Sequence, residues 1–155
     1  MSLVIRELGE RDLDAVAAIE AAGNPRPWSR QLFAGEFDLD PATRHWLVAC
    51  AGGQVVGFGG LMFALDTAHL LNLGVASAHT QRGIGYRLCL ALVGDAIGRS
   101  ATSLTLEVRA SNTAAIALYR KLGMSASGTR PGYYPDGEDA IIFWLCDLNT
   151  VTSAL

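Results

Sequence analysis

The chain has 155 residues, the size of one ordinary folded domain. Half of these residues are hydrophobic, but glycines and charges interrupt every apolar run well before the roughly 18 residues of a membrane helix, so we expect no membrane partner. The formal net charge of −3 gives no support for a nucleic-acid partner, which normally meets a basic surface. We expect a single domain over residues 1–148, followed by a short C-terminal tail over residues 149–155.

The N-terminal residues 1–8 form an apolar, β-rich run. This run meets Glu7, Glu10 and Arg11 too soon for a signal peptide, whose apolar region is longer. We therefore expect a first strand at residues 1–8, and a protein that stays in the cytoplasm.

The rest of the first half predicts two helices and then three strands. Apolar residues at helical spacing indicate a helix over residues 12–22, and a second, short helix starts at Ser29. The strands are expected over residues 45–50, 54–65 and 69–75. Gly52-Gly53 joins the first two of them and is a two-residue hairpin signal, so this half should form an antiparallel meander.

The second half alternates strands and helices. The predicted elements are a helix over residues 84–97, a strand over 104–109, a helix that starts at Asn112 and ends before Gly123, and strands over 126–130 and 140–146. Together with the first half, they indicate an α+β fold with a mixed sheet of about seven strands and helices on both faces.

The stretch from Leu104 to Gly123 carries the residues with the clearest chemistry. Apolar and polar residues alternate from Leu104 to Val108, which is typical of a half-buried strand. Ser111 or Asn112 can cap the following helix, and Gly123 stands where a left-handed C-cap belongs. Glu107 is therefore expected near a strand end that opens toward a helix start.

The segment Gln81-Arg82-Gly83-Ile84-Gly85-Tyr86 follows a strand and begins a helix. Unpaired N–H groups and the helix dipole attract a phosphate at such a place, and glycines let the backbone approach it closely. The dinucleotide fingerprint fails because position 88 is leucine, and no Walker lysine follows. From this segment alone, an ordinary tight turn is an equal alternative.

The cysteines and histidines show no metal-site spacing. The cysteines are Cys50, Cys89 and Cys146. They lie far apart among apolar neighbours without C-x-x-C spacing, so we expect three reduced core thiols. The histidines are His45, His69 and His79. They lack helical i, i+4 pairing and carboxylate companions, so we predict no metal, although His79 is near enough to the glycine loop to face a phosphate.

Three blocks of this chain resemble the GNAT superfamily of acetyl-CoA-dependent N-acetyltransferases. The first is the Arg82-Gly83-Ile84-Gly85 loop, and about twenty residues later come Leu-Glu-Val-Arg-Ala-Ser-Asn at 106–112 and Ala-Leu-Tyr-x-x-Leu-Gly at 117–123. They occur in the family's order. Pro27-Trp28-Ser29 and residues 133–140, which include Tyr-Tyr-Pro and Glu-Asp-Ala, extend the likeness to the ribosomal-protein-alanine N-acetyltransferase branch, over nearly the whole chain.

The resemblance implies the GNAT-like acyl-CoA N-acyltransferase fold, acetyl-CoA as co-substrate, and a protein N-terminus, possibly of a ribosomal protein, as partner. It implies that the cofactor contacts are Leu73, Gly74, Val75, Gln81, Arg82, Gly83, Ile84, Gly85, Tyr86 and Asn112. It also implies that Glu107 is the general base and Tyr119 the general acid. Trp28, Tyr133 and Tyr134 would frame the acceptor.

The chemistry of acetyl transfer suits these residue types. An ammonium cannot attack a thioester, so a carboxylate such as Glu107 is needed to remove a proton. At pH 7.4 roughly a quarter of α-amino groups are neutral, against about a thousandth of lysine side chains, so one modest base suits an N-terminal amine best. Full proton transfer from an unperturbed Tyr119 to a thiolate is uphill by about 2 kcal/mol, which favours hydrogen-bond donation.

Other interpretations stay open at this point. Glu107 could be an edge-strand charge paired with Arg109 or a lysine, and Tyr119 could be a core aromatic with its hydroxyl in water. The predicted activity is acetylation of an N-terminal α-amine, most specifically that of alanine in a small-subunit ribosomal protein. The alternatives are acetylation of lysine or a small amine, and a non-catalytic acyl-CoA sensor. Thr80, Tyr86 and Pro131-Gly132 depart from the family pattern and weaken the expectations on cofactor affinity and acceptor choice.

Overall fold

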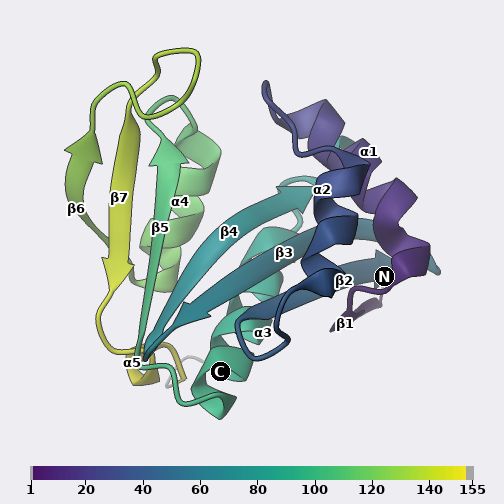
Figure 1. Ribbon diagram of the computed structural model, residues 1–155, viewed down its shortest axis with the longest axis horizontal. Helices are drawn as coiled ribbons and strands as arrows, with labels where there is room; N and C mark the ends of the chain where they lie inside the picture. Colours follow the sequence, from purple (N-terminus) through teal and green to yellow (C-terminus); the bar gives the residue numbers. More distant parts are fainter. Residues whose placement is uncertain (1, 153–155) are drawn as a thin grey trace.

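The computed structural model describes residues 2–152 and confirms the mixed sheet with helices on both faces (Figure 1). The strands are β1 (Leu3–Glu7), β2 (Arg44–Ala51), β3 (Gln54–Ala64), β4 (Thr67–Val75), β5 (Ser103–Arg109), β6 (Ser125–Arg130) and β7 (Ala140–Leu145). The helices are α1 (Leu13–Gly23), α2 (Arg30–Gly35), α3 (Ile84–Gly98), α4 (Thr113–Leu122) and α5 (Asn149–Thr152), with short 3-10 turns η1 (Glu10–Asp12), η2 (Glu36–Asp38) and η3 (Ser77–His79).

The seven strands form one sheet in the order β1-β2-β3-β4-β5-β7-β6. Strands β1 to β4 are antiparallel neighbours, as predicted, and Gly52-Gly53 turns β2 into β3 with both residues at positive φ. Strand β5 is parallel to β4, and β7 and β6 follow it as antiparallel partners. The parallel contact at β4 and β5 therefore joins the two halves of the chain.

Strands β4 and β5 pair only at one end and then separate. Three residue pairs, Thr67–His69 with Ser103–Thr105, make up their whole register. Beyond them Figure 1 shows the two strands diverging, and the β3–β4 register slips by one residue so that Leu71 has no partner in β3. A bulge of this kind bends the strand that carries it. Beyond their three paired residues, β4 and β5 therefore each leave backbone groups unpaired on the side that faces the other strand.

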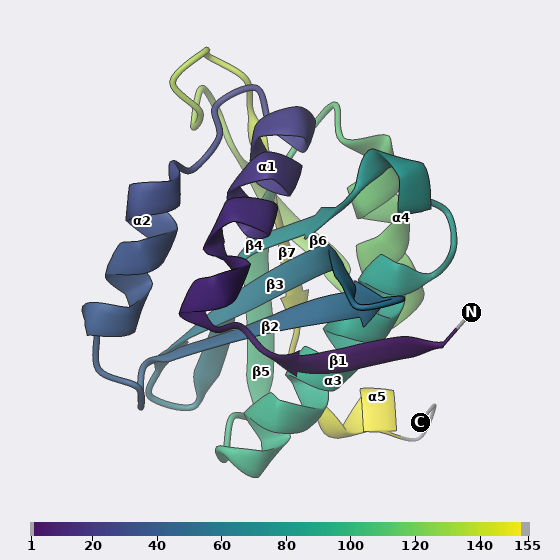
Figure 2. The ribbon, with the colours of Figure 1, turned by 90° about the vertical axis from the view of Figure 1, so that its right-hand side faces the viewer.

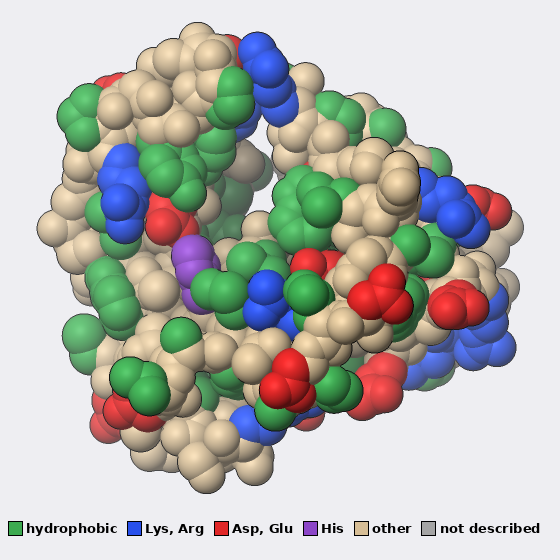
Figure 3. Space-filling view, viewed as in Figure 1, with side chains coloured by type: hydrophobic (Ala, Val, Ile, Leu, Met, Phe, Trp, Pro, Cys, Tyr) green, Lys and Arg blue, Asp and Glu red, His purple; other side chains and the backbone are tan. Residues whose placement is uncertain are grey.

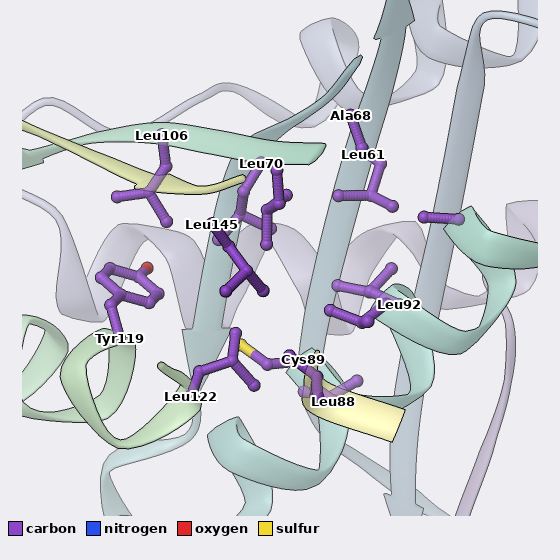
Figure 4. Packing of buried hydrophobic residues seen from close by; sticks show 14 of the residues in the cluster. Leu61, Ala68, Leu70, Leu88, Cys89, Leu92, Leu106, Tyr119, Leu122 and Leu145 are labelled. Carbon is purple, nitrogen blue, oxygen red and sulfur yellow. The ribbon is translucent and has the colours of Figure 1, made fainter. Parts of the chain in front are cut away.

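Helices cover the two faces of the sheet separately. One core joins α3 and α4 to inward residues of β4 and β5, among them Leu70 and Leu106 (Figures 2 and 4). The second core joins α1 and α2 to the other face, around Phe33, Trp46 and Phe58. Because side chains alternate along a strand, Glu107 lies on the sheet face opposite to that of Leu106.

Two of the three cysteines lie in the core. Cys50 and Cys89 are buried, and burial raises the pKa of the Cys89 thiol to about 12, but Cys146 is exposed. The expectation of a third core thiol was wrong, because β7 ends at Leu145 and the next side chain falls outside the core. Val151 in α5 is buried against the main core, and residues 153–155 lie outside the described residues. Within the described part, no helix is long and apolar enough to cross a bilayer.

Candidate active site

A groove of about 1150 Å³ opens where β4 and β5 diverge. Its walls come from α1 and the segment after it, β4, the η3–α3 loop, β5, α4 and the β6–β7 loop, and Figure 3 shows the surface hollowed there. The structure brings most of the predicted site residues together in its lining: Trp28, Leu73, Gly74, Val75, Gln81, Gly83, Ile84, Gly85, Tyr86, Glu107, Asn112, Tyr119 and Tyr134. Arg82 and Tyr133 do not line it.

The N-terminus of α3 forms one end of the groove. Gly83 precedes the helix in a left-handed conformation, with φ of 77°, and no side chain caps the helix. The first bond of the helix runs from Arg87 N to Gly83 O, so the N–H groups of Ile84, Gly85 and Tyr86 have no helical partner. A non-glycine residue at 83 would be strained, and the backbone donors at this end suit an anion.

Two basic side chains stand near these donors. Lys121 of α4 lines the groove, and its Nζ lies 4.3 Å from the ring centre of Tyr86. Position 86 is commonly basic in the family pattern, whereas this chain has tyrosine there. His79 also lines the groove, and its Nδ1 is buried without a hydrogen-bond partner among the described residues. The orphaned nitrogen and the cation both favour a phosphate-bearing ligand at this end.

The free edge of β4 presents backbone donors to the groove. Ala76 N donates to Val56 O of β3, so by the antiparallel alternation Gly74 also bonds toward β3, whereas the N–H groups of Leu73 and Val75 point to the open side. Leu73 N already donates to Asn72 Oδ1 at 2.9 Å. Val75 therefore offers the free donor of this edge, and Leu73 becomes available only if Asn72 releases it.

Glu107 is held from two sides at the centre of the sheet. Its Oε2 lies 2.6 Å from His69 Nε2, and its Oε1 lies 3.8 Å from Arg130 Nε. At Glu107, β5 pairs with β7 alone, because its register with β4 ends at Thr105, and Arg109 pairs with other carboxylates. The alternative of an edge-strand pair with Arg109 was wrong.

The expectation that the histidines lack carboxylate companions was also wrong. His69 contacts Glu107, and His45 Nε2 lies 2.6 Å from Asp95 Oδ2 of α3. Both pairs join residues far apart in the sequence, so helical spacing could not reveal them. In residues 2–152, no three His, Cys, Asp or Glu side chains gather in a geometry that could hold a metal ion.

Tyr119 is both a core residue and part of the groove wall. Only 6% of it is exposed, and its ring packs 6.2 Å from that of Phe143. Figure 4 shows the ring beside Leu106 with the hydroxyl on the side of Leu70, and this hydroxyl makes no hydrogen bond to the described residues. Burial raises the pKa of Tyr119 above its ordinary value of 10. The phenol is thus a neutral donor that no neighbouring group engages.

Asn112 acts as the predicted cap. Its Oδ1 accepts a hydrogen bond from Ala115 N at 3.1 Å, and Gly123 ends α4 with φ of 103°. The same residue also lines the groove. Capping occupies the oxygen of Asn112, which leaves its Nδ2 as the group that can contact a ligand.

Sequence reasoning missed Glu20, a buried carboxylate in the groove wall. It is 4% exposed, and its Oε2 accepts from Asn72 Nδ2 at 2.8 Å, Trp28 N at 3.0 Å and Asn24 Nδ2 at 3.2 Å. These bonds connect α1 to β4 and to the Trp28 segment. The sequence signal was weak, because a single glutamate at the end of an amphipathic helix looks like a solvated charge.

Arg109 fixes the β6–β7 loop against β5. Its Nη1 lies 2.8 Å from Asp136 Oδ2 and 2.9 Å from Glu138 Oε1, and its guanidinium stacks 4.1 Å from the ring centre of Tyr134. Glu138 also accepts from Ser111 N at 2.8 Å. The loop that carries Tyr134 is thereby attached to the β5–α4 connection.

These bonds lower the pKa values of both loop carboxylates. For Asp136 the main cause is the backbone N–H of Glu138, followed by Arg109; for Glu138 it is Ser111, followed by Arg109. Because the folded-state pKa of each carboxylate is lowered, its ionised form stabilises the folded loop. This stabilisation is complete above the ordinary pKa values, 3.8 for Asp136 and 4.5 for Glu138, and is lost as the pH falls through the lowered values. Loop attachment should therefore be complete at neutral pH.

Arg109→Ala is expected to loosen this loop without unfolding the sheet. Both carboxylates lose their cation and Tyr134 loses its stacking partner, so amide exchange at Tyr134 should accelerate by about tenfold, the equivalent of one charge-assisted hydrogen bond. Hydrogen exchange followed by mass spectrometry measures this. Arg30→Ala, which removes a cation from an exposed pair with Asp14, is the control. Unchanged exchange in the Arg109 variant would contradict this role.

Comparisons with known proteins bear on the family and the fold of this chain. The profile described as the acetyltransferase (GNAT) family matches residues 13–124. The ribosomal protein bS18-alanine N-acetyltransferase of Escherichia coli K12 is 38% identical over 147 residues, covering 91% of this chain and 95% of the relative. The crystal structure of the Escherichia coli ribosomal-protein-S18-alanine N-acetyltransferase superposes with a TM-score of 0.83 at 36% identity, over 93% of both chains. The crystal structure of Ard1 from Thermoplasma volcanium superposes with a TM-score of 0.87 at 26% sequence identity, over 94% of this chain and 97% of the Ard1 chain. The chain therefore belongs to the acetyltransferase (GNAT) family, and the resemblance predicted from its motifs is confirmed.

Proposed function

We propose that this protein transfers the acetyl group of acetyl-CoA to the α-amine of a protein N-terminus, with the N-terminal alanine of a small-subunit ribosomal protein as acceptor. The observation that carries the proposal is the position of Glu107, a carboxylate held in the groove wall where β4 and β5 part. The name of the Escherichia coli relative supports the acceptor. Such an enzyme would meet ribosomal proteins in the cytoplasm.

The groove fits acetyl-CoA. The unpaired N–H groups at the start of α3, the orphaned Nδ1 of His79 and the cation of Lys121 suit the phosphates. The Val75 N–H, at the free edge of β4, suits the acetyl carbonyl or the pantetheine amides. Arg82 is the one predicted cofactor residue that does not line the groove. It would therefore attract the phosphates of acetyl-CoA by long-range charge alone.

Bound acetyl-CoA would supply the acetyl thioester, and the residues of this chain would supply proton handling. The Glu107 carboxylate accepts a proton from the acceptor's ammonium group, which frees the nitrogen lone pair for attack on the thioester carbon. None of Cys50, Cys89 and Cys146 lines the groove, which supports direct transfer with both substrates bound rather than a cysteine-linked acyl enzyme.

Tyr119 would stabilise the departing sulfur by a hydrogen bond. The raised pKa of its buried phenol makes proton transfer to a thiolate less favourable than for an exposed tyrosine. Donation of a hydrogen bond needs no such transfer. The free hydroxyl at the groove wall is suited to that role.

Trp28 and Tyr134 would frame the acceptor. Both line the groove, and Glu20 and Arg109 hold their segments in place. Tyr133 packs edge-on against Tyr134 with ring centres 5.1 Å apart and is half exposed, so it would support Tyr134 rather than contact the acceptor directly.

A pair of matched peptides tests the acceptor class. Both begin with alanine and contain one internal lysine, but one has a blocked α-amine. We expect acetyl transfer to the free peptide at its α-amine, and no transfer to the blocked one. Transfer to the lysine of both peptides would favour a lysine acetyltransferase, and acetyl-CoA binding without any transfer would favour the sensor.

A further inference from the structure

A small closed cavity lies directly behind the groove, on the side of α3 and α4. Its volume is about 10 Å³, the room of about one water molecule, and residues of β3, β4, β5, α3 and α4 contribute to its lining. Leu70, Leu106 and Tyr119 line both the cavity and the groove. These three side chains therefore separate the two spaces, and we call them the dividing wall.

The cavity is apolar. Among the described side chains that line it, only those of Cys89 and Tyr119 carry a sulfur or an oxygen atom, and the others are aliphatic (Figure 4). A buried water normally needs two to four polar partners, whereas an apolar cavity of this kind stays dry and accepts carbon groups. The space behind the dividing wall therefore suits part of an alkyl chain better than a water molecule.

The dividing wall stands beside the reacting groups of the proposed transfer. Leu70 and Leu106 directly follow the last residue pair of β4 and β5, so they lie at the closed end of the gap between the strands. Their side chains belong to the core under α3 and α4, and Glu107 is on the opposite face of the sheet. A thioester whose sulfur meets the Tyr119 hydroxyl thus has its acyl carbons next to the two leucines, and the acceptor amine approaches from the side of Glu107.

We propose that the dividing wall limits the transferred acyl group to two carbons, and that the cavity behind it is a latent pocket for longer straight-chain acyl groups. This rests on the proposed function. The methyl group of acetyl ends at the wall. Each further carbon of a propionyl or butyryl group would have to displace a closely packed side chain that is at most 7% exposed.

The covalent step is the same for every acyl length. The acceptor nitrogen bonds to the thioester carbon, and the carbon–sulfur bond breaks with its electron pair on sulfur. Of the two protons that the ammonium nitrogen loses, Glu107 takes the first and the departing thiolate ends with the second. Acyl length therefore changes only how the thioester fits against the wall.

Leu70→Ala tests the wall, because it removes one of the side chains that separate the groove from the cavity and leaves Glu107 and Tyr119 in place. For the wild type, kcat/KM with propionyl-CoA should be about thirtyfold lower than with acetyl-CoA, as expected for one excess methylene in a tight site. In Leu70→Ala the ratio of the propionyl-CoA value to the acetyl-CoA value should rise by about tenfold, and in the milder Leu70→Val by about threefold. General losses of activity cancel in this ratio.

Leu92→Ala is the matched control, because Leu92 of α3 lines the cavity but not the groove. The substitution deletes the same carbon atoms and leaves the wall closed, so the ratio should stay within about twofold of the wild-type ratio. Cys89→Met added to Leu70→Ala refills the cavity from α3 and should cancel most of the rise. Thermal unfolding of all variants checks folding.

A crystal structure of Leu70→Ala with butyryl-CoA needs no turnover, and it should place the end of the acyl chain between Cys89 and Leu92. An acyl chain that points to the acceptor side, or ratios in Leu70→Ala and Leu70→Val equal to that of the wild type, would overturn the proposal. Equal use of propionyl-CoA and acetyl-CoA by the wild type would overturn it as well. Absence of transfer from every acyl-CoA would instead defeat the proposed function, and the crystal structure would still decide whether the cavity takes the acyl chain.

Discussion

Glu107→Gln is expected to lower kcat by about 10³-fold, because the amide keeps the shape of the side chain but cannot accept the acceptor's proton. Glutamine can still accept a hydrogen bond from His69 Nε2, so the strands around it should stay in place. The proposed acetyl-CoA contacts lie at the α3 end of the groove, so the Kd of acetyl-CoA should stay within about twofold of the wild-type value. Steady-state kinetics with an alanine-starting peptide, together with calorimetry, measures both quantities.

The control for this substitution is Glu10→Gln, which neutralises an exposed carboxylate in η1 outside the groove. Its kcat should match that of the wild type. A Glu107→Gln protein with near-normal kcat would remove Glu107 from the role of base.

Glu20→Ala is expected to lower the free energy of unfolding by about 3 kcal/mol and to raise the KM for the acceptor peptide. The carboxylate satisfies three donors, on Asn24, Trp28 and Asn72, and its removal leaves them without that acceptor in a partly buried place. The Trp28 segment then loses its attachment to α1. Urea denaturation and peptide kinetics measure the two effects.

Two companion variants sharpen the test of Glu20. Glu20→Gln retains an oxygen that can accept two of the three bonds, so its loss of stability should be smaller than that of Glu20→Ala. Asp14→Ala removes an exposed carboxylate from the same helix, and its stability should change by less than about 0.5 kcal/mol. If Glu20→Ala and Asp14→Ala lowered the free energy of unfolding by equal, small amounts, the hydrogen bonds of Glu20 would not be needed for stability.

The unit around Glu107 could be predicted from the sequence because its signals are local. Alternation from Leu104 to Val108 defines the strand, Asn112 caps the helix, and Gly123 ends it in the left-handed conformation, all as expected. The glycine hairpin at 52–53 and the start of α3 were predictable for the same reason. Each of these features depends on residues within one turn or one strand.

The contacts that adjust the site could not be predicted, because they depend on how distant strands align. His69 and Glu107 are 38 residues apart, and Glu20 and Asn72 are 52 apart. Their meeting requires the parallel register of β4 and β5 and the one-residue slip at Leu71, neither of which leaves a periodic trace in the chain. The same limit explains why the histidines looked as though they had no acidic companions.

The catalytic and binding roles stay predictions, and acceptor identity is the central one. The most direct test is mass spectrometry of a library of peptide N-termini incubated with the protein and isotope-labelled acetyl-CoA. We expect label on the α-amine of alanine-starting peptides, with loss of that label in Glu107→Gln. Label confined to lysine side chains, or absent from every peptide while acetyl-CoA still binds, would contradict it.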